Sequence, residues 1–227
     1  MAAPSFRIKI CGIRDQLALA AAFHHGADAI GLNFVPSSAR YLPPDDRMTR
    51  RLAEFCQQNG LKAVGLFVNT PNSTVREVVQ SLGLGAVQLH GDETLQQAGE
   101  LMAAGIEVFR AVRLPTSSLS ATTIDAAVTA WVDLGVGILL DADVGNQFGG
   151  QGTSLDWHVL ARWSKQHAGP WMLAGGLRPE TVGKAISICQ PHGVDVASGV
   201  ERPRGTKAPK LIEQFCHHAR QQLSLLE

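Results

Sequence analysis

The chain has 227 residues, and its 20 Lys and Arg residues balance its 20 Asp and Glu residues. A content of 45% hydrophobic and 18% charged residues is typical of a globular protein and excludes a chain that stays disordered. The lack of net positive charge argues against non-specific nucleic-acid binding.

The sequence contains no pattern typical of a membrane or secreted protein. The longest early apolar run, residues 17–23, falls far short of the roughly 18 residues that a membrane span needs. The first residues do not combine a basic region, an apolar stretch and a small-residue cleavage site. The four cysteines form no CxxC pair, which argues against a zinc site and predicts reduced thiols in the cytoplasm.

One pattern repeats along the chain: a short apolar run, a polar or glycine-rich break, and an amphipathic stretch. Asp15 and Asp156 are expected to begin helices, and Gly26 and Gly60 to end them. The apolar runs predict strands at residues 6–11, 29–34, 61–68, 86–90, 106–113, 137–141, 171–174 and 194–197. The amphipathic stretches predict helices at 15–25, 45–58, shortly after Pro71, 93–104, 118–130, 156–167, 179–189 and 207–226.

Eight strands that alternate with eight helices predict an α/β protein with a parallel sheet. About 28 residues per unit fit a closed (β/α)₈ TIM barrel, and the absence of a proline-rich or charged linker predicts one domain over residues 1–227. An open doubly wound sheet is the alternative. It usually carries GxGxxG after the first strand, where this chain has Cys11-Gly12-Ile13-Arg14-Asp15.

In a barrel, side chains at the carboxyl ends of the strands converge on one site. Cys11 ends the first strand, and Lys9 lies two residues earlier on the same face. A nearby ammonium is expected to lower the pKa of the Cys11 thiol toward a usable thiolate. The alternative is that Cys11 is a small buried residue of the core. The other cysteines fall in predicted helices and are expected to pack there: Cys56, Cys189 and Cys216.

Three further side chains are candidates for the same site. Asp141 follows four apolar or small residues, so burial should raise its pKa and suit it to general acid catalysis; a solvated loop aspartate is the alternative. Arg40, beside two serines, could pair with a carboxylate through both arms of its guanidinium, although most loop arginines face water. His90 ends the fourth strand, and a buried, hydrogen-bonded histidine is the default interpretation.

Two glycine-rich turns follow the seventh and eighth strands and predict a phosphate site. Gly175 and Gly176 lie in the first turn, and Ser198 and Gly199 in the second. Glycines let backbone N–H groups approach an oxyanion, and barrels often bind phosphate after these two strands. Tight turns without a ligand are the alternative. A third glycine-rich segment, residues 148–153, is long enough to close over a substrate.

The order and spacing of eight short segments, from about residue 7 to about 216, resemble those of the phosphoribosylanthranilate isomerase family. Each segment alone is a weak signal, but the ordered set is specific. The segments are KICGI at 9–13, SSARY at 37–41, VGLFVN at 64–69, QLHGDE at 88–93, LLDA at 139–142, GGQGTSLDW at 149–157, LAGGL at 173–177 and DVASGVE at 195–201. The chain departs from the pattern usual in the family at Ala39, Thr153 and Ala197.

The resemblance implies a cofactor-independent and metal-free Amadori rearrangement of N-(5-phosphoribosyl)anthranilate in tryptophan biosynthesis. It implies Cys11 as general base, Asp141 as general acid and Arg40 as the residue that binds the anthranilate carboxylate. Backbone groups of the two glycine turns, at Gly175, Gly176, Ser198 and Gly199, would bind the phosphate. Lys9, His90 and Asp195 complete the expected substrate-binding set, with supporting roles for Lys9 and Asp195.

Two other functions remain as alternatives. One is a barrel with another substrate, such as a different sugar-phosphate isomerase or indole-glycerol-phosphate synthase. The synthase needs additional Lys and Glu groups at its strand ends, where this chain has Cys and Asp. The other is a phosphate-binding scaffold without chemistry. The expected partner is the small phosphorylated substrate, with no nucleic acid and no membrane, and the protein is expected to be a monomer or homodimer.

Overall fold

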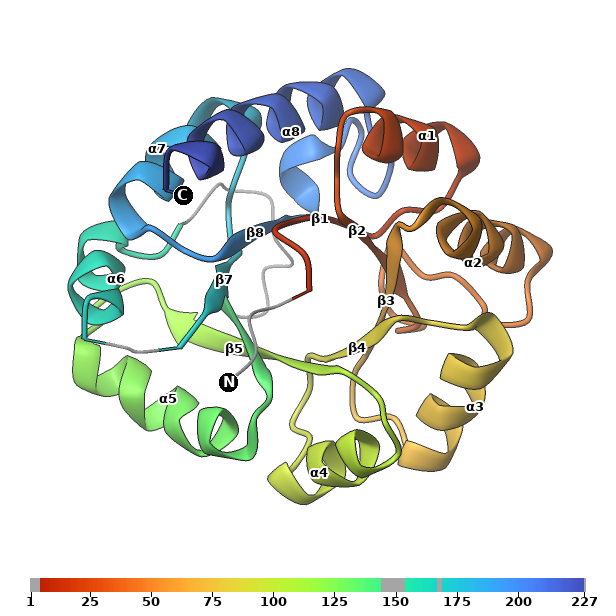
Figure 1. Cartoon of the computed structure of the whole chain (residues 1–227), viewed down its shortest axis with the longest axis horizontal. Coiled ribbons are helices and arrows are strands. Elements are labelled where there is room, and N and C mark those ends of the chain that lie inside the picture. The colour runs from red at the N-terminus through yellow and green to blue at the C-terminus, as the bar shows by residue number, and fades with distance from the viewer. Residues whose placement is uncertain (1–4, 144–153, 167–168, 227) are drawn as a thin grey trace.

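The computed structural model describes residues 5–143, 154–166 and 169–226. Its strands form a closed barrel in which each strand pairs with its neighbours in the sequence (Figure 1). β1 (Ile8–Cys11) pairs in parallel with both β2 (Ala29–Asn33) and β8 (Gly193–Val196), and these pairings close the barrel. The prediction of a (β/α)₈ barrel is confirmed, and the open-sheet alternative is wrong.

The remaining strands follow in chain order, with helices on the outside of the barrel (Figure 1). These strands are β3 (Lys62–Phe67), β4 (Ala86–Leu89), β5 (Val108–Pro115), β6 (Gly137–Asp143) and β7 (Trp171–Leu173). The helices are α1 (Gln16–His24), α2 (Arg47–Asn59), α3 (Asn72–Leu82), α4 (Leu95–Ala103), α5 (Ala121–Leu134), α6 (Trp157–Ser164), α7 (Pro179–Cys189) and α8 (Pro209–Leu223), with short 3₁₀ turns η1 (Ser198–Val200) and η2 (Ser224–Leu226).

Local capping signals set several helix boundaries as predicted. The Asp15 carboxylate accepts a hydrogen bond from the Ala18 N–H and caps α1, and Asp156 caps α6 in the same way. Gly60 ends α2 in the left-handed conformation, with φ of 69°. The interpretation of these residues as helix ends is therefore confirmed.

The largest differences from the predicted bounds lie in β5, β6 and α5. β5 and β6 pair all the way to Pro115 opposite Asp143, so both strands run past their predicted ends and Asp141 lies within β6. α5 begins at Ala121, where the Ser120 hydroxyl accepts a hydrogen bond from Thr123 N and caps the helix, and it ends at Leu134, past the predicted limit at residue 130. The predicted end of α6 at residue 167 lies outside the described residues.

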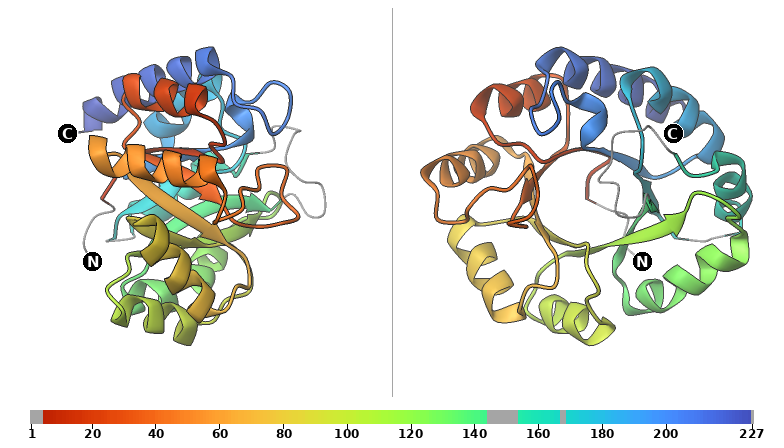
Figure 2. Two further views of the ribbon diagram at one scale, coloured as in Figure 1. Left: turned by 90° about the vertical axis from the view of Figure 1, so that its right-hand side faces the viewer. Right: turned by 180° about the vertical axis from the view of Figure 1, so that it is seen from behind.

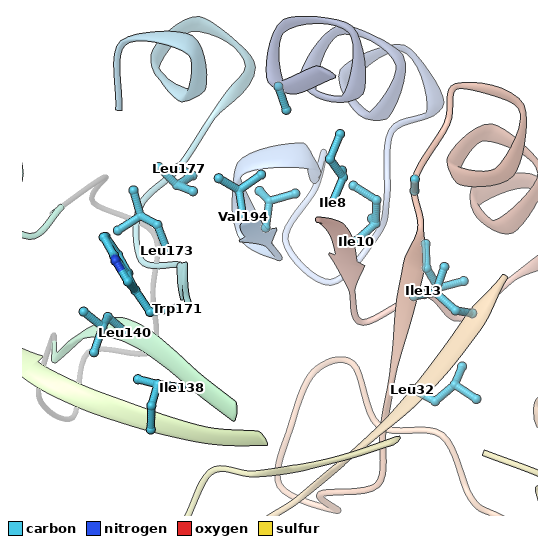
Figure 3. Close-up of a cluster of buried hydrophobic side chains, with 14 of the residues drawn as sticks. Ile8, Ile10, Ile13, Leu32, Ile138, Leu140, Trp171, Leu173, Leu177 and Val194 are labelled. Carbon is cyan, nitrogen blue, oxygen red and sulfur yellow. The ribbon is translucent and has the colours of Figure 1, made fainter. Parts of the chain in front are cut away.

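Strand side chains alternate between two layers, as a period of two requires. Ile8, Ile10 and Val194 lie in the larger apolar layer, between the strands and the surrounding helices (Figure 3). A smaller cluster fills the inside of the barrel, with Phe109 and Met172 among its members. Consequently Lys9 and Cys11, which alternate with Ile8 and Ile10, point toward the barrel axis.

The connections after β2 and after β8 project from the same end of the barrel (Figure 2). This is the end at which the parallel strands terminate, and it is where barrel enzymes place their active sites. The segment at residues 148–153, which the sequence predicts to cover a substrate, lies outside the described residues. None of the described helices is both long enough and apolar enough to cross a membrane.

Candidate active site

A cavity of about 440 Å³ opens at the carboxyl ends of the strands. β1, β2, β3, β4, β6 and β8 contribute to its wall, together with the connections after β2, β7 and β8. Nine of the ten predicted site residues line it: Cys11, Arg40, His90, Asp141, Gly175, Gly176, Asp195, Ser198 and Gly199. The fold thus gathers residues from six separate parts of the sequence around one space.

Cys11 occupies space that Gly31 leaves open on the neighbouring strand. The two residues are paired in the register of β1 and β2. A Cβ atom at Gly31 would lie 2.7 Å from Cys11 Sγ, closer than real Cβ atoms come to a neighbour, and 3.0 Å from Cys11 Cα, which is unusually tight. The sequence analysis did not identify Gly31 as a site residue, because its role depends on the pairing of the two strands.

Gly31→Ala is expected to displace the Cys11 thiol and to lower kcat by about 10²-fold, since misplacing a reacting group by about 1 Å costs that much. The change adds one methyl group and requires no unusual backbone angle. Steady-state kinetics would measure the effect, and Gly183→Ala is the matched control, because a Cβ at Gly183 meets nothing within 4 Å. A Gly31→Ala protein with unchanged kcat would contradict the importance of this close contact.

The expectation that Lys9 leaves Cys11 as a ready thiolate is wrong. Lys9 does favour the thiolate, but burial is the larger effect and raises the pKa of the Cys11 thiol above its ordinary value near 9. Asp195, a negative charge close by, raises it further. The thiol of the resting protein is therefore protonated at neutral pH.

Lys9 is the predicted site residue that does not line the cavity. Its side chain is 1% exposed and lies within the barrel. The Lys9 ammonium donates to Asp195 Oδ1 at 2.7 Å and to Gln88 Oε1 at 2.8 Å. Lys9 thus links β1 to β8 and β4 beneath the cavity. This position fits the predicted supporting role and does not bring Lys9 into contact with a ligand in the cavity.

Asp141 has the environment of a general acid. Burial is the main reason that its pKa rises from 3.8 to about 6, and the nearby charge of Asp195 adds to the effect. Its Oδ1 accepts a hydrogen bond from the Ala142 N–H at 2.9 Å, which partly opposes the rise. A pKa close to neutrality lets one group hold and release a proton under physiological conditions.

His90 stands beside Asp141 at the cavity wall. Its Nε2 lies 3.5 Å from Asp141 Oδ2, and its Nδ1 lies 3.1 Å from Gln88 Nε2. Burial and the positive charge of Lys9 lower the pKa of His90 to about 4. His90 is therefore a neutral, hydrogen-bonded imidazole at pH 7, but with 24% of its side chain exposed it also faces the cavity.

The predicted fork between Arg40 and a carboxylate exists within the protein itself. Arg40 Nε and Nη2 donate to the two carboxylate oxygens of Glu201 at 2.6 and 2.9 Å. Glu201 also accepts from Lys207 Nζ at 2.7 Å and from the Gly205 N–H at 2.9 Å. One buried carboxylate thus holds two cations, and these partners lower the pKa of Glu201 to about 2.

Glu201→Gln is expected to lower the free energy of unfolding at pH 7 by about 3 kcal/mol, because it leaves two buried cations without their counter-charge. Urea denaturation would measure the change, with Glu54→Gln on the exposed face of α2 as the matched control. Since the folded-state pKa of Glu201 is depressed to about 2, its contribution is present above pH 4.5 and is lost as the pH falls toward 2. The difference in free energy of unfolding between the wild-type protein and Glu201→Gln should therefore become smaller as the pH falls from 4.5 toward 2. A difference that stays constant over this pH range would contradict the role of ionised Glu201 as the counter-charge of the two cations.

The two glycine turns face each other across one side of the cavity. Gly175 and Gly176 have φ angles of +77° and +67°, which side-chain-bearing residues rarely adopt. A Cβ at Gly199 would lie 1.9 Å from the Leu177 carbonyl oxygen, so the turn after β8 packs directly on the turn after β7. Ser198 lies beside Gly199 and starts η1.

Besides Gly31, three further contributors to the site are singled out only through the structure. Gln88 bridges Lys9 and His90, Glu201 holds Arg40 in place, and Lys207 pairs with the same Glu201 carboxylate. Gln88 and Glu201 fall within segments that resemble the family, and Gln88 shares the inward face of its strand with His90. That alternation is the signal that could have identified Gln88. Nothing local distinguishes Lys207, which lies in what the sequence predicts as a helix start.

Comparison with known proteins agrees with this geometry. The family model described as N-(5'-phosphoribosyl)anthranilate (PRA) isomerase matches residues 8–218. The chain belongs to the PRA isomerase family. It is 38% identical over 220 residues to the N-(5'-phosphoribosyl)anthranilate isomerase of Myxococcus xanthus, covering 95% of this chain and 97% of that protein. It is 36% identical over 214 residues to the enzyme of Gloeothece citriformis, covering 92% of each chain. The resemblance predicted from the sequence motifs is confirmed.

Solved structures of PRA isomerases share the fold. The enzyme of Thermotoga maritima aligns with a TM-score of 0.83 and 32% identity, covering 95% of this chain and 99% of that one. A phosphoribosyl anthranilate isomerase in complex with reduced 1-(o-carboxyphenylamino)-1-deoxyribulose 5-phosphate aligns with a TM-score of 0.79 and 31% identity, with the same coverage. The fold, the isomerase class and the place in tryptophan biosynthesis predicted from the sequence are therefore confirmed.

Proposed function

We propose that Cys11 and Asp141 act as the base and acid of the PRA isomerase reaction, and that Arg40 and the two glycine turns bind the two ends of its substrate. The observation that carries the proposal is the convergence of a buried thiol and a carboxyl with a raised pKa on one cavity, 130 positions apart in the sequence. The family's reaction transfers protons and needs both groups.

The first step assigned to the site opens the ribose ring. Protonated Asp141 gives its proton to the ring oxygen, the bond from that oxygen to C1 breaks, and the electrons of the amine nitrogen form a C1=N iminium. The pKa of Asp141, about 6, supports this role because the group is close to the ordinary working pH.

In the second step the Cys11 thiolate removes the proton from C2. The electrons form a C1=C2 bond and neutralise the iminium nitrogen, which gives an enolamine. C1 then gains a proton and the C2 hydroxyl loses its proton, which yields the ketone, so the reaction moves protons and shifts one double bond with no net gain or loss of atoms. The Lys9 ammonium supports Cys11 by opposing the effect of burial on the thiol.

Residues on two sides of the cavity would bind the two anionic ends of the substrate and so orient it. The anthranilate carboxylate would bind Arg40, whose Nε and Nη2 are committed to Glu201 and whose remaining terminal nitrogen is outside that pair. The phosphate would bind backbone N–H groups of Gly175, Gly176, Ser198 and Gly199, where glycine permits close approach. Two anionic ends held apart in this way would place C1 and C2 between Asp141 and Cys11.

The enzyme is proposed to work in the cytoplasm on this small molecule alone. All four cysteines are free and buried, a usage typical of a reducing compartment. The PRA isomerase complex described above contains a reduced carboxyphenylamino-deoxyribulose phosphate, which has the same carboxylate and phosphate ends as the proposed substrate.

The direct test is turnover of N-(5'-phosphoribosyl)anthranilate by the purified chain, followed by the loss of anthranilate fluorescence. The expected result is catalysis without added metal or cofactor, together with growth of a tryptophan auxotroph that lacks this isomerase. Asp141→Asn serves as the control in the growth assay. Binding of the product by calorimetry without turnover would overturn the proposal and favour the scaffold alternative.

A further inference from the structure

We infer that Gln88 is a positioning residue that fixes the proton of His90 on Nε2, so that His90 donates toward Asp141 and cannot take the proton that Asp141 delivers. This inference rests on the proposed role of Asp141 as the general acid. It concerns a buried residue of β4 to which the sequence analysis gave no role. Four side chains lie in a row, from Lys9 through Gln88 and His90 to Asp141.

Lys9 determines how the Gln88 amide is turned. Both side chains are almost completely buried, with 1% exposure each. The Lys9 ammonium has donors only, so it must face an acceptor, and it donates to Gln88 Oε1 at 2.8 Å. Asp195 fixes the ammonium from the other side through its contact at 2.7 Å. With its oxygen held by Lys9, the Gln88 amide presents its nitrogen to His90.

Gln88 in turn determines which ring nitrogen of His90 carries the proton. Gln88 Nε2 lies 3.1 Å from His90 Nδ1, and an amide nitrogen can only donate. His90 Nδ1 must therefore accept, and the proton of the neutral imidazole lies on Nε2. The low pKa of His90, about 4, keeps the ring neutral at pH 7, so the ring carries a single N–H proton, on one of its two nitrogens.

The consequence falls on Asp141. His90 Nε2 lies 3.5 Å from Asp141 Oδ2, while the Ala142 N–H donates to Asp141 Oδ1. If Nε2 lacked a proton, its lone pair would face the carboxyl group and would accept a hydrogen bond from the acidic proton, which would hold that proton away from the substrate. A protonated Nε2 has no lone pair to offer, so the Asp141 proton can go only to a group in the cavity.

The first test is a measurement on the unmodified protein. Long-range ¹H–¹⁵N correlation spectra of ¹⁵N-labelled protein at pH 7 without substrate distinguish the two tautomers of each histidine, and loss of one set of signals in His90→Asn identifies His90. The expected pattern is that of an Nε2–H imidazole. An Nδ1–H pattern or a charged ring would overturn the inference. Because no substrate is present, a failure of the proposed function would leave this result standing.

The second test changes Gln88. Gln88→Met removes the donor to Nδ1, and Gln88→Glu replaces it with an acceptor that favours Nδ1–H. In Gln88→Glu the His90 signals should move toward Nδ1–H, and kcat should fall at least about ten-fold with a KM change within about three-fold. Gln88→Met adds no acceptor, so its His90 signals should move less than those of Gln88→Glu. The matched control is Gln80→Glu, an exposed residue of α3, which should leave both spectra and kinetics unchanged.

Two outcomes of the second test would overturn the inference. One is a folded Gln88→Glu protein, judged by circular dichroism and thermal unfolding, in which His90 keeps its proton on Nε2. The other is a complete switch of the tautomer with an unchanged kcat. A variant that only loses stability would lower the unfolding temperature without moving the His90 signals. If one variant does not fold, the spectrum of the unmodified protein and the other variant decide the question.

Discussion

Asp141→Asn is expected to lower kcat by about 10³-fold and to change KM by less than about three-fold, because it removes the proton donor and keeps the size of the side chain. An amide in this position can still accept from the Ala142 N–H, which bonds to Asp141 Oδ1. Steady-state fluorescence assays with N-(5'-phosphoribosyl)anthranilate would measure both constants. Asp133→Asn on the exposed part of α5 is the matched control and should leave them unchanged.

The same substitution should make the protein more stable at neutral pH. Because the folded-state pKa of Asp141 is raised to about 6 from 3.8, the unfolded chain ionises before the folded one as the pH rises. The wild-type protein therefore loses stability relative to Asp141→Asn between about pH 4 and 6, by at most about 3 kcal/mol, since one pKa unit corresponds to about 1.4 kcal/mol. Urea denaturation at pH 3.5 and pH 7 would measure the difference. An Asp141→Asn protein as active as the wild type, or less stable than the wild type at pH 7, would contradict the role of Asp141 as a buried general acid.

Cys11→Ala is expected to lower kcat by 10²- to 10⁴-fold, roughly the range for loss of a general base. The iminium formed with help from Asp141 would persist, because nothing in the site would remove the C2 proton. Rapid-mixing measurements should therefore show ring opening without product formation. Cys56→Ala is the matched control: Cys56 is also buried, and its loss should reduce the stability of α2 without changing kcat. An active Cys11→Ala protein would remove the base assignment.

The pH dependence of kcat/KM follows from the two pKa directions. The active form needs protonated Asp141 and the Cys11 thiolate, although the pKa of Asp141 is about 6 and that of Cys11 lies above 9. The fraction of protein with both protonated Asp141 and the Cys11 thiolate rises with pH up to about 6. It then stays level up to the thiol pKa and falls above that pKa. Lys9→Met should raise the pKa of the Cys11 thiol further and should lower kcat/KM over the pH range in which it is constant. Direct titration of thiolate absorbance would locate the pKa of Cys11, and a thiolate already present at pH 7 would contradict this account.

The sequence predicted the barrel because that fold depends on local patterns. Short apolar strands, capping residues such as Asp15 and Asp156, and glycine helix ends such as Gly60 each act within a few neighbouring residues. Among the strands, β5 and β6 run furthest past their predicted carboxyl ends. There, pairing between the two strands extends the ladder beyond what either sequence indicates, as far as Pro115 opposite Asp143.

The direction of the Cys11 pKa shift could not be predicted from Lys9 alone. Position on the same strand face correctly indicated that the ammonium favours the thiolate. Burial has the opposite sign and is larger, and burial depends on how the whole barrel encloses the thiol. The direction of the Asp141 pKa shift was easier to predict, because its main cause is burial, and a position directly after a run of apolar residues indicates burial from the sequence.

By itself the sequence determined the order of strands and helices, the family, and the residue types at the strand ends, since alternation and motif spacing are properties of neighbouring positions. Only the tertiary structure decided which distant residues touch: the space that Gly31 leaves for Cys11, the pairing of Arg40 and Lys207 with Glu201, and the link from Lys9 through Gln88 to His90. The physical reason is closure of the barrel. It brings strands far apart in the chain within hydrogen-bond distance and removes the water that would otherwise weaken their charges.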